Sequence, residues 1–140
     1  MERKASAVWE GGLKDGQGTV STESGVLSDA KYSFGTRFEN AKGTNPEELV
    51  GAAHAGCFSM ALSAQLGEAG ITPERIQTTA TVKLEKTPEG FSVPAIHLEV
   101  VARIRGGDRA AFEAAANKAK EGCPISKLLK AQITMNAKVE

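Results

Sequence analysis

The stretch NPEELVGAAHAGCFSMALSAQLGEAG, from Asn45 to Gly70, decides the fold because it predicts one long central helix. Asn45 suits the N-cap, and Pro46 suits the first helical position. Glu47 and Glu48 follow in the first turn, where carboxylates complement the positive end of a helix. Gly70 supplies the stop. Because the helix is apolar or small on most sides, we expect it to pack on another helix through the small residues Ala52, Ala53, Ala55 and Gly56.

The segments before this helix predict short strands joined by tight turns. The expected strands are residues 5–9 (ASAVW), 19–27 (TVSTESGVL) and 30–38 (AKYSFGTRF). Glycine adopts positive φ angles at no steric cost, so the glycines of this region suit hairpin turns. These glycines are Gly11, Gly12, Gly16, Gly18 and Gly25.

The segments directly after the helix predict a long hairpin. Residues 76–85 and 96–105 alternate apolar and polar side chains, as half-buried antiparallel strands do. The TPEG sequence at 87–90 is a suitable turn between them.

The C-terminal third predicts two helices and a last strand. Residues 108–122 form an amphipathic pattern capped by Asp108, a short helix begins at Cys123, and residues 133–139 alternate as a closing strand. This order of elements is typical of an α+β fold, with antiparallel sheets packed against the long central helix.

The composition predicts a single domain over residues 1–140. A chain with 41 % hydrophobic residues can bury one core, and no change of composition divides it. Its 17 basic and 17 acidic residues are dispersed, which argues against a nucleic-acid partner. No apolar run approaches the roughly 20 residues that span a bilayer, and no signal-peptide pattern follows the charged N-terminus. We therefore expect a soluble, cytoplasmic protein that binds neither nucleic acid nor membrane.

The two cysteines, Cys57 and Cys123, are the first candidates for chemistry. Structural disulfides are rare in a reducing cytosol, which leaves inert core thiols, metal ligands or a redox pair. Cys57 lies in the middle of the long helix, where burial raises the pKa of a thiol, whereas Cys123 lies at a helix N-terminus that favours a thiolate. From the residues alone, Cys123 is expected to be the more acidic cysteine and Cys57 the more buried one.

A metal site is a second interpretation of the same helix. His54 and Cys57 form an H-x-x-C pair on one helix face, a spacing that can hold two ligands of one metal ion. Structural zinc takes four ligands, and only Cys123 and His97 remain as nitrogen or sulfur donors. His97 lies on the polar face of its strand and is expected to point away from the core. An ordinary polar histidine at a helix interface is therefore the preferred interpretation of His54, and no metal is predicted.

Taken singly, the charged residues near the start of the helix do not indicate a function. Arg37 lies at the end of a predicted strand, where a surface arginine is the default interpretation. Glu47 and Glu48 need no role beyond stabilising the first turn.

Taken together, three motifs closely resemble the OsmC/Ohr family of thiol-dependent peroxidases. They are NPEEL, AAHAGCFSMAL and GCPISKLLKA, and the similarity extends upstream through WEGGLKDGQGTVSTESGVLSDAKYSFG to cover essentially the whole chain. The arginine within GTRF, Arg37, matches the OsmC branch rather than the Ohr branch. The resemblance implies an OsmC-like fold, an intertwined homodimer with its active sites at the subunit interface, and no cofactor.

The resemblance also implies a role for each candidate residue. Cys57 matches the peroxidatic cysteine, which becomes a sulfenic acid, and Cys123 matches the resolving cysteine, which condenses with it to a disulfide. Arg37 matches the arginine that stabilises the thiolate and orients the peroxide. Glu47 matches the carboxylate that positions this arginine, and the alignment is the only reason to prefer it to Glu48. The implied substrates are organic hydroperoxides in preference to hydrogen peroxide. The implied reductant is a dithiol such as a lipoylated protein, and the implied role is defence against oxidative and osmotic stress.

The spacing between Glu47 and Cys57 leads to a hypothesis about the dimer. Ten positions along one helix separate the two residues by about 15 Å. If both belong to one site, two copies of the helix must run antiparallel, with Glu47 contributed by the second subunit and the subunit that supplies Arg37 left open. The small residues of GAAHAG would let the helices approach closely. Residues available for an apolar entrance to the site are Phe38, Leu49 and Phe58.

Three other functions stay open from the sequence alone. A non-enzymatic dimer or binding protein would use its cysteines only for packing, and a metal-binding module would bind metal during purification. A thiol–disulfide oxidoreductase is disfavoured because there is no C-x-x-C motif. Thiols that react with one equivalent of a hydroperoxide distinguish the peroxidase from the binding protein.

Overall fold

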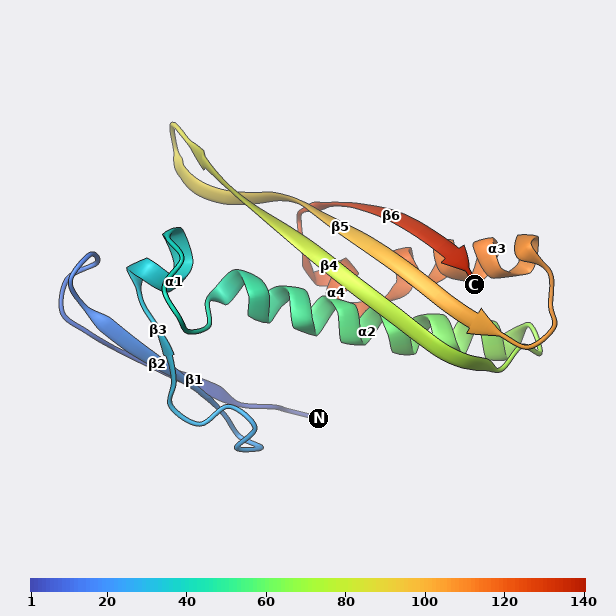
Figure 1. Ribbon diagram of the computed structural model, residues 1–140, viewed down its shortest axis with the longest axis horizontal. Helices are drawn as coiled ribbons and strands as arrows, with labels where there is room; N and C mark the ends of the chain where they lie inside the picture. The colour runs from blue at the N-terminus through green and yellow to red at the C-terminus, as the bar shows by residue number, and fades with distance from the viewer. The chain divides into compact units, whose positions relative to one another are not determined.

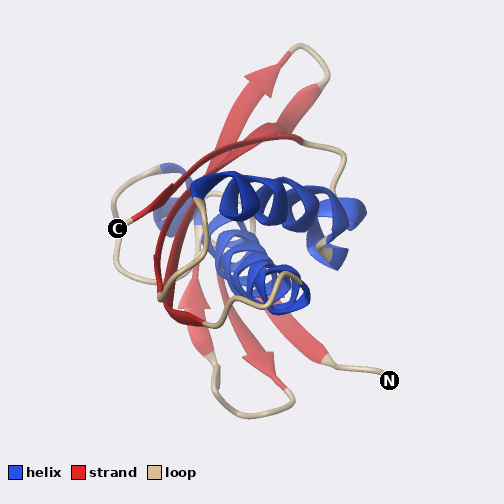
Figure 2. Ribbon diagram, turned by 90° about the vertical axis from the view of Figure 1, so that its right-hand side faces the viewer, coloured by secondary structure: helices blue, strands red, loops and turns tan.

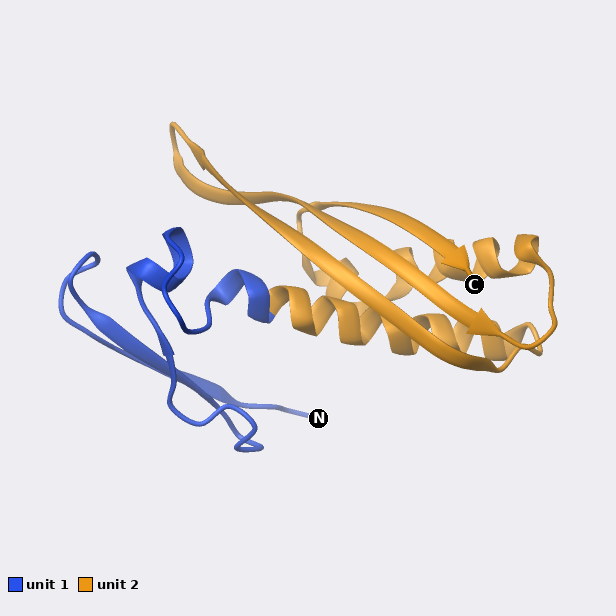
Figure 3. Cartoon of the chain, in the orientation of Figure 1, with its two compact units in different colours: residues 1–49 blue, residues 50–140 orange.

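The computed structural model describes residues 1–140, which form six strands and four helices (Figures 1 and 2). The elements are β1 (Ala5–Glu10), β2 (Gln17–Thr22), β3 (Ala30–Tyr32), α1 (Phe34–Phe38), α2 (Pro46–Glu68), β4 (Pro73–Thr87), β5 (Gly90–Ile104), α3 (Arg109–Gly122), α4 (Pro124–Leu128) and β6 (Gln132–Val139). They fall into two compact units, Met1–Leu49 and Val50–Glu140 (Figure 3), and each unit holds one three-stranded sheet. A single domain over residues 1–140 stays a prediction beside this division.

The first unit is a small antiparallel sheet, β1–β2–β3, followed by α1. Gly18 of β2 pairs with Trp9 on one side and Tyr32 on the other, and the two aromatic rings meet with their centroids 5.4 Å apart. A Cβ on Gly18 would lie 2.6 Å from both rings, so the close contact requires glycine at this strand position. None of the buried hydrophobic residues of the chain lies in this unit.

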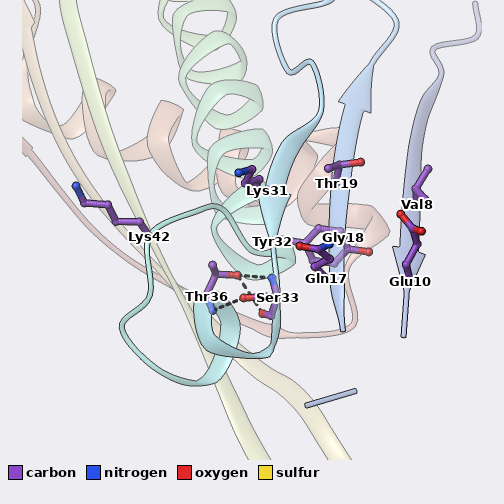
Figure 4. A pocket seen from close by; sticks show the side chains of 10 residues that line it. All are labelled: Val8, Glu10, Gln17, Gly18, Thr19, Lys31, Tyr32, Ser33, Thr36 and Lys42. Carbon is purple, nitrogen blue, oxygen red and sulfur yellow. Dashed lines mark hydrogen bonds between the residues drawn. The ribbon is translucent and has the colours of Figure 1, made fainter. Parts of the chain in front are cut away.

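The strand predicted over residues 30–38 is wrong in its second half. Only Ala30–Tyr32 is a strand, and Phe34–Phe38 forms the helix α1. Ser33 starts this helix with a capping box (Figure 4). Its hydroxyl accepts from the Thr36 N–H at 3.3 Å, while the Thr36 hydroxyl accepts from the Ser33 N–H at 2.8 Å. The aromatic side chains around this S-x-x-T spacing favour a strand by propensity, and the local cap outweighs them.

The long helix α2 begins and ends as its sequence predicts. Asn45 caps it, because its side-chain oxygen accepts a 2.8 Å hydrogen bond from the Glu48 N–H. The helix ends at Glu68, and Gly70 follows with a φ angle of +76° that favours glycine.

The second unit packs α2 and α3 on one face of the β4–β5–β6 sheet (Figure 2). The apolar face of β5 is fully buried, as its alternation predicts, through Ile96, Leu98, Val100 and Ala102. The helices contribute Phe58, Leu62 and Leu66 from α2 and Phe112, Ala115, Ala116 and Ala119 from α3. Truncating one of the large core side chains to alanine costs about 2–5 kcal/mol of stability.

The sheet of the second unit departs from the predicted antiparallel arrangement at its last strand. β4 and β5 pair antiparallel and turn at 87–90 as predicted, but β6 pairs with β5 in parallel. The chain passes through α3 and α4 between β5 and β6. This helical crossover carries the chain back along the sheet, so the next strand enters in the same direction as β5.

The helix α2 also corrects the expectation that no apolar run approaches the length of a membrane span. By length and hydropathy alone, its 23 residues could cross a bilayer. Three of its apolar side chains are instead fully buried in the core of the second unit: Phe58, Leu62 and Leu66. A core helix can therefore have the same apolar composition as a membrane span. The rest of α2 carries a row of small or apolar side chains that this chain leaves exposed: Ala52, Ala53, Gly56, Met60, Ser63, Ala64 and Gly67.

Candidate active site

The two cysteines meet in the second unit although they lie 66 residues apart in sequence. Cys57 comes from the middle of α2, and Cys123 stands at the junction where α3 ends and α4 begins. Their sulfurs are 2.8 Å apart and both thiols are free. A covalent S–S bond is about 2.05 Å long, so these are two thiols in hydrogen-bonding contact, placed for disulfide formation.

The burial of the two cysteines is the reverse of the sequence prediction. Cys123 is fully buried and Cys57 is only half-buried. Cys123 is enclosed because it joins two helices. Its N–H donates to the Ala119 carbonyl of α3 at 2.9 Å, and α4 begins at the next residue. Cys57 precedes the fully buried Phe58 and therefore lies at the side of the core-facing stripe of α2. Cys57 is thus the sulfur that a small molecule reaches more easily.

The pKa values of the two thiols move in opposite directions. Burial raises the pKa of Cys57, and its hydrogen bond with Cys123 raises it further. Burial opposes ionisation of Cys123 as well, but its hydrogen bond with Cys57 and its interactions with Ser126 and the Ile125 N–H outweigh burial and lower the pKa of Cys123. The prediction that Cys123 is the more acidic thiol agrees with this order. Within the second unit, a thiolate is therefore more stable on Cys123 than on Cys57, and Cys57 needs a cation from outside this unit to ionise.

Arg37 and Glu47 form an ion pair in the first unit. Arg37, from α1, donates through Nε at 2.9 Å and Nη2 at 2.7 Å to Oε1 of Glu47, and the Nε distance to Oε2 is 3.3 Å. Glu48 instead accepts from the Thr44 hydroxyl at 2.8 Å. The geometry therefore selects Glu47 as the partner of Arg37, a choice that the sequence left to alignment alone. This pairing uses the Nε–Nη2 edge of the guanidinium and leaves Nη1 outside the ion pair.

Aromatic side chains surround Arg37. Its guanidinium carbon lies 5.3 Å from the centre of the Phe38 ring, and Phe38 packs on Phe34 with centroids 4.9 Å apart. A cavity of about 280 Å³ opens beside them, lined by Trp9, Leu13, Tyr32, Ser33, Phe34, Arg37 and Phe38. A larger cavity of about 470 Å³ in the same unit is more polar and includes Lys31 and Lys42 (Figure 4).

The apolar entrance predicted from the sequence stays a prediction, and the structure excludes one of its two aromatic residues. Phe38 lines the cavity beside Arg37, whereas Phe58 is fully buried in the core. Trp9, Leu13 and Phe34 were not predicted for this role. The Phe34–Phe38 pair could have been found from its i, i+4 spacing, had residues 34–38 been recognised as a helix.

The two histidines lie in different environments. His54 is fully buried and bonds through Nε2 to the Ser126 hydroxyl at 2.8 Å, and burial lowers its pKa. His97 is exposed on the sheet, where it bonds to Thr134 at 2.7 Å and Glu99 at 3.2 Å. Both positions match the sequence predictions. No three His, Cys, Asp or Glu side chains among residues 1–140 gather in a way that could hold a metal ion.

The comparisons with known proteins agree on one family. The family model of the OsmC-like proteins matches residues 39–138. Peroxiredoxin OsmC of Escherichia coli (strain K12) is 56 % identical over 136 residues, which cover 97 % of this chain and 95 % of that protein. The crystal structure of the organic hydroperoxide resistance protein OhrB of Bacillus subtilis aligns with a TM-score of 0.68 at 26 % identity, over 98 % of both chains. An OsmC-like protein of unknown function from Vibrio cholerae aligns with a TM-score of 0.78 over 99 % of both chains, and at 18 % identity this likeness shows the fold alone.

The four predicted site residues thus form two pairs, Cys57 with Cys123 in one unit and Arg37 with Glu47 in the other. The fold carrying them is that of the OsmC and Ohr structures. With its match to the family model and its identity to a relative along nearly the full length, the chain belongs to the family of OsmC-like proteins.

Proposed function

We propose that this protein is a thiol-dependent peroxidase that reduces organic hydroperoxides, and hydrogen peroxide more weakly, to alcohols and water. The contact between the free thiols of Cys57 and Cys123, at 2.8 Å, is the observation that carries the proposal. Similarity to a peroxiredoxin and to organic hydroperoxide resistance proteins supports it.

The two cysteines supply both electrons of the reduction. The Cys57 thiolate attacks the terminal oxygen of the hydroperoxide, the O–O bond breaks, and the alkoxide takes a proton and leaves as an alcohol. Cys57 becomes a sulfenic acid, which condenses with the Cys123 thiol to form a disulfide and one molecule of water. A dithiol, such as a lipoylated protein, then reduces the disulfide by exchange.

The Arg37–Glu47 pair is the proposed activator of Cys57. Burial and the hydrogen bond with Cys123 raise the pKa of Cys57, so its thiolate needs a nearby cation. A fixed guanidinium stabilises the thiolate, and it stabilises the charge that develops on the leaving oxygen without giving up its own proton. Glu47 holds the guanidinium by its Nε–Nη2 edge, which leaves Nη1 outside the ion pair and available to the reacting atoms.

The active site is proposed to be composite, with the Arg37–Glu47 pair and the cysteine pair coming from different subunits of a homodimer. Glu47 and Cys57 belong to the same helix, so about 15 Å separates them along its axis. The exposed small residues of α2 support close packing of a second copy, since a Cβ added at Gly56 would meet nothing within 4 Å. Two antiparallel copies of α2 would bring the first turn of each to the middle of the other.

The apolar cavity beside Arg37 is the proposed binding site for the alkyl part of the substrate. Its volume of about 280 Å³ and its lining by Trp9, Leu13, Phe34 and Phe38 suit a small hydrocarbon group. Burying an alkyl group here contributes binding free energy that hydrogen peroxide cannot gain. We place the reaction in the cytoplasm, in defence against oxidative and osmotic stress.

A steady-state assay tests the proposal. The reduced protein is given tert-butyl hydroperoxide or hydrogen peroxide, with a dithiol or a monothiol as reductant. We expect faster turnover with the organic peroxide and with the dithiol. Equal turnover of both peroxides would contradict the substrate assignment, and no turnover of either would contradict the function.

A further inference from the structure

Two side chains that the proposed reaction does not use lie one helical turn from the cysteines. His54 precedes Cys57 by three residues on α2, and Ser126 follows Cys123 by three residues on α4, so each pair shares a helix face. His54 Nε2 and Ser126 Oγ are 2.8 Å apart, the same separation as the two sulfurs. His54 is fully buried, and Ser126 is only 8 % exposed. The two contacts thus form adjacent bridges between the same two helices.

The unpartnered nitrogen of His54 fixes the direction of its hydrogen bond. Nδ1 is buried without a partner. An orphaned buried N–H is rarer in proteins than an orphaned acceptor, so the neutral ring carries its proton on Nε2 and donates to Ser126 Oγ. Burial, which lowers the pKa of His54, keeps the ring neutral. The hydroxyl hydrogen of Ser126 is then turned away from the imidazole and is free to donate to another acceptor, and the sulfur of Cys123 lies three residues earlier in the chain, at the N-cap of α4.

We propose that His54 and Ser126 position Cys123 for disulfide formation, His54 by holding Ser126 and Ser126 by donating its hydroxyl hydrogen to the Cys123 sulfur. The inference rests on the proposed peroxidase function. Both are positioning residues, because they act through Cys123.

The chemical step itself involves only the two sulfurs and one oxygen. The Cys123 thiolate attacks the sulfur of the Cys57 sulfenic acid, the S–S bond forms and the S–O bond breaks. The Cys123 sulfur is oxidised and the sulfenic sulfur is reduced. The leaving hydroxide takes the proton that the Cys123 thiol had released and becomes water. A hydrogen bond from Ser126 favours this step because it increases the fraction of Cys123 that is ionised and fixes the sulfur in the line of attack.

The inference separates the two steps of the reaction. Loss of the Ser126 hydroxyl is expected to slow formation of the disulfide but not formation of the sulfenic acid on Cys57, because a less ionised Cys123 does not oppose ionisation of Cys57. Loss of one hydrogen bond to a charged sulfur is expected to slow disulfide formation by about tenfold.

A quenched single-turnover experiment on the full-length reduced protein measures both steps. The protein is mixed with one equivalent of tert-butyl hydroperoxide and quenched at intervals with a sulfenic-acid trap and a thiol-alkylating agent. Mass spectrometry then counts trapped sulfenic acid, free thiol and disulfide. The variants are Ser126→Ala and His54→Leu, with Ser126→Thr and His54→Gln as conservative replacements. Ser59→Ala is the control, since it removes a hydroxyl of α2 that bonds to Thr78 at 2.8 Å.

We expect Ser126→Ala and His54→Leu to form sulfenic acid no more slowly than the wild type and to form the disulfide about tenfold more slowly. Ser126→Thr and His54→Gln should recover most of the second rate, and Ser59→Ala should match the wild type in both steps. Should His54→Leu fail to fold, the two Ser126 variants carry the test alone.

Three results would overturn the inference and leave the proposed function standing: disulfide formation at the wild-type rate in Ser126→Ala, equal slowing of both steps, or no recovery in Ser126→Thr. A wild-type protein that forms neither sulfenic acid nor disulfide would overturn both.

Discussion

At the scale of single residues, each half of the site fixes the chemistry of a charged or ionisable group. Glu47 holds Arg37 by two nitrogens on one edge of the guanidinium, so the position of the positive charge is defined. The Cys57–Cys123 contact raises the pKa of one thiol and lowers that of the other. The proposed reaction instead needs a thiolate on Cys57, and Arg37 is the cation proposed to lower the pKa of Cys57.

The first prediction at this scale separates the two neighbouring glutamates. Glu47→Gln should lower kcat/KM for an organic hydroperoxide by about tenfold or more, because a neutral amide holds Arg37 less firmly. Glu48→Gln should leave kcat/KM within about twofold of the wild type, since Glu48 bonds to Thr44 and not to Arg37. The same loss in both variants would show that only the charge of the first turn matters.

The second prediction at this scale concerns the substrate. Phe38→Ala should reduce the preference for tert-butyl hydroperoxide over hydrogen peroxide, because it removes apolar surface from the cavity beside Arg37. The ratio of the two kcat/KM values is the measurement. Phe91→Ala, which truncates an aromatic side chain that is 55 % exposed on β5, is the control and should keep the ratio. An unchanged ratio in Phe38→Ala would remove Phe38 from the substrate site.

At the scale of elements, the sequence predicted what local signals determine. The caps at Asn45 and Asp108 predicted the starts of α2 and α3, and strict alternation predicted the β4–β5 hairpin and its buried face. The helix α1 was missed because aromatic residues favour strands and its cap is unusual, with Thr36 in the place of the acidic residue.

At this scale, the structural features that could not be predicted from the sequence depend on contacts between distant segments. The direction of β6 follows from a crossover of two helices, which no local pattern records. The burial of Cys123 follows from the packing of α3 and α4, so its exposure relative to Cys57 was predicted in the wrong order. The bond between His54 and Ser126 joins residues 72 positions apart, and the sequence indicated only the H-x-x-C spacing of His54 and Cys57.

The buried histidine leads to a prediction about pH. The pKa of His54 is lowered from 6.5 by burial, so the unfolded chain binds a proton there at a pH where the folded chain does not. The free energy of unfolding should therefore fall as the pH falls below about 6.5, and above that value this contribution is constant.

Chemical denaturation between pH 5 and 8, values that bracket the pKa of free histidine, is the measurement. His54→Gln should show a weaker loss of stability on the acid side than the wild type. An identical pH dependence in His54→Gln would contradict the assignment of a neutral, buried imidazole.

At the scale of the whole molecule, two features of the chain support the proposed homodimer. The first unit contributes no residue to the hydrophobic core, and Val8, Leu13 and Val26 are more than half exposed. The helix α2 keeps a row of small or apolar side chains exposed, with Met60 at 78 %. Exposed apolar surface of this extent is typical of an oligomer interface, in accord with the proposed homodimer.

A substitution at Gly56 tests the dimer. A Cβ at Gly56 has open space around it, so Gly56→Leu should fold, but it should block the close approach of a second α2. We expect a monomer by analytical ultracentrifugation and a loss of peroxidase activity. Ala114→Leu adds the same bulk to the exposed face of α3 and should leave the dimer intact. A stable, active Gly56→Leu dimer would contradict the packing proposed for α2.

Mixed dimers test whether one site draws on both subunits. Cys57→Ser and Glu47→Ala homodimers should each be nearly inactive. After unfolding and refolding together, heterodimers carry one site with both residues intact, so up to half of the activity per heterodimer should return. Heterodimers without any recovered activity would show that Glu47 and Cys57 act within one subunit.

The central claim is that Cys57 and Cys123 together reduce a hydroperoxide, and a single-turnover count of thiols tests it most directly. Reduced protein is mixed with one equivalent of tert-butyl hydroperoxide, its free thiols are counted, and peptide mapping identifies any new disulfide. We expect the loss of both thiols of each chain, one Cys57–Cys123 disulfide and one equivalent of alcohol. Two thiols that remain free while the peroxide stays intact would contradict it.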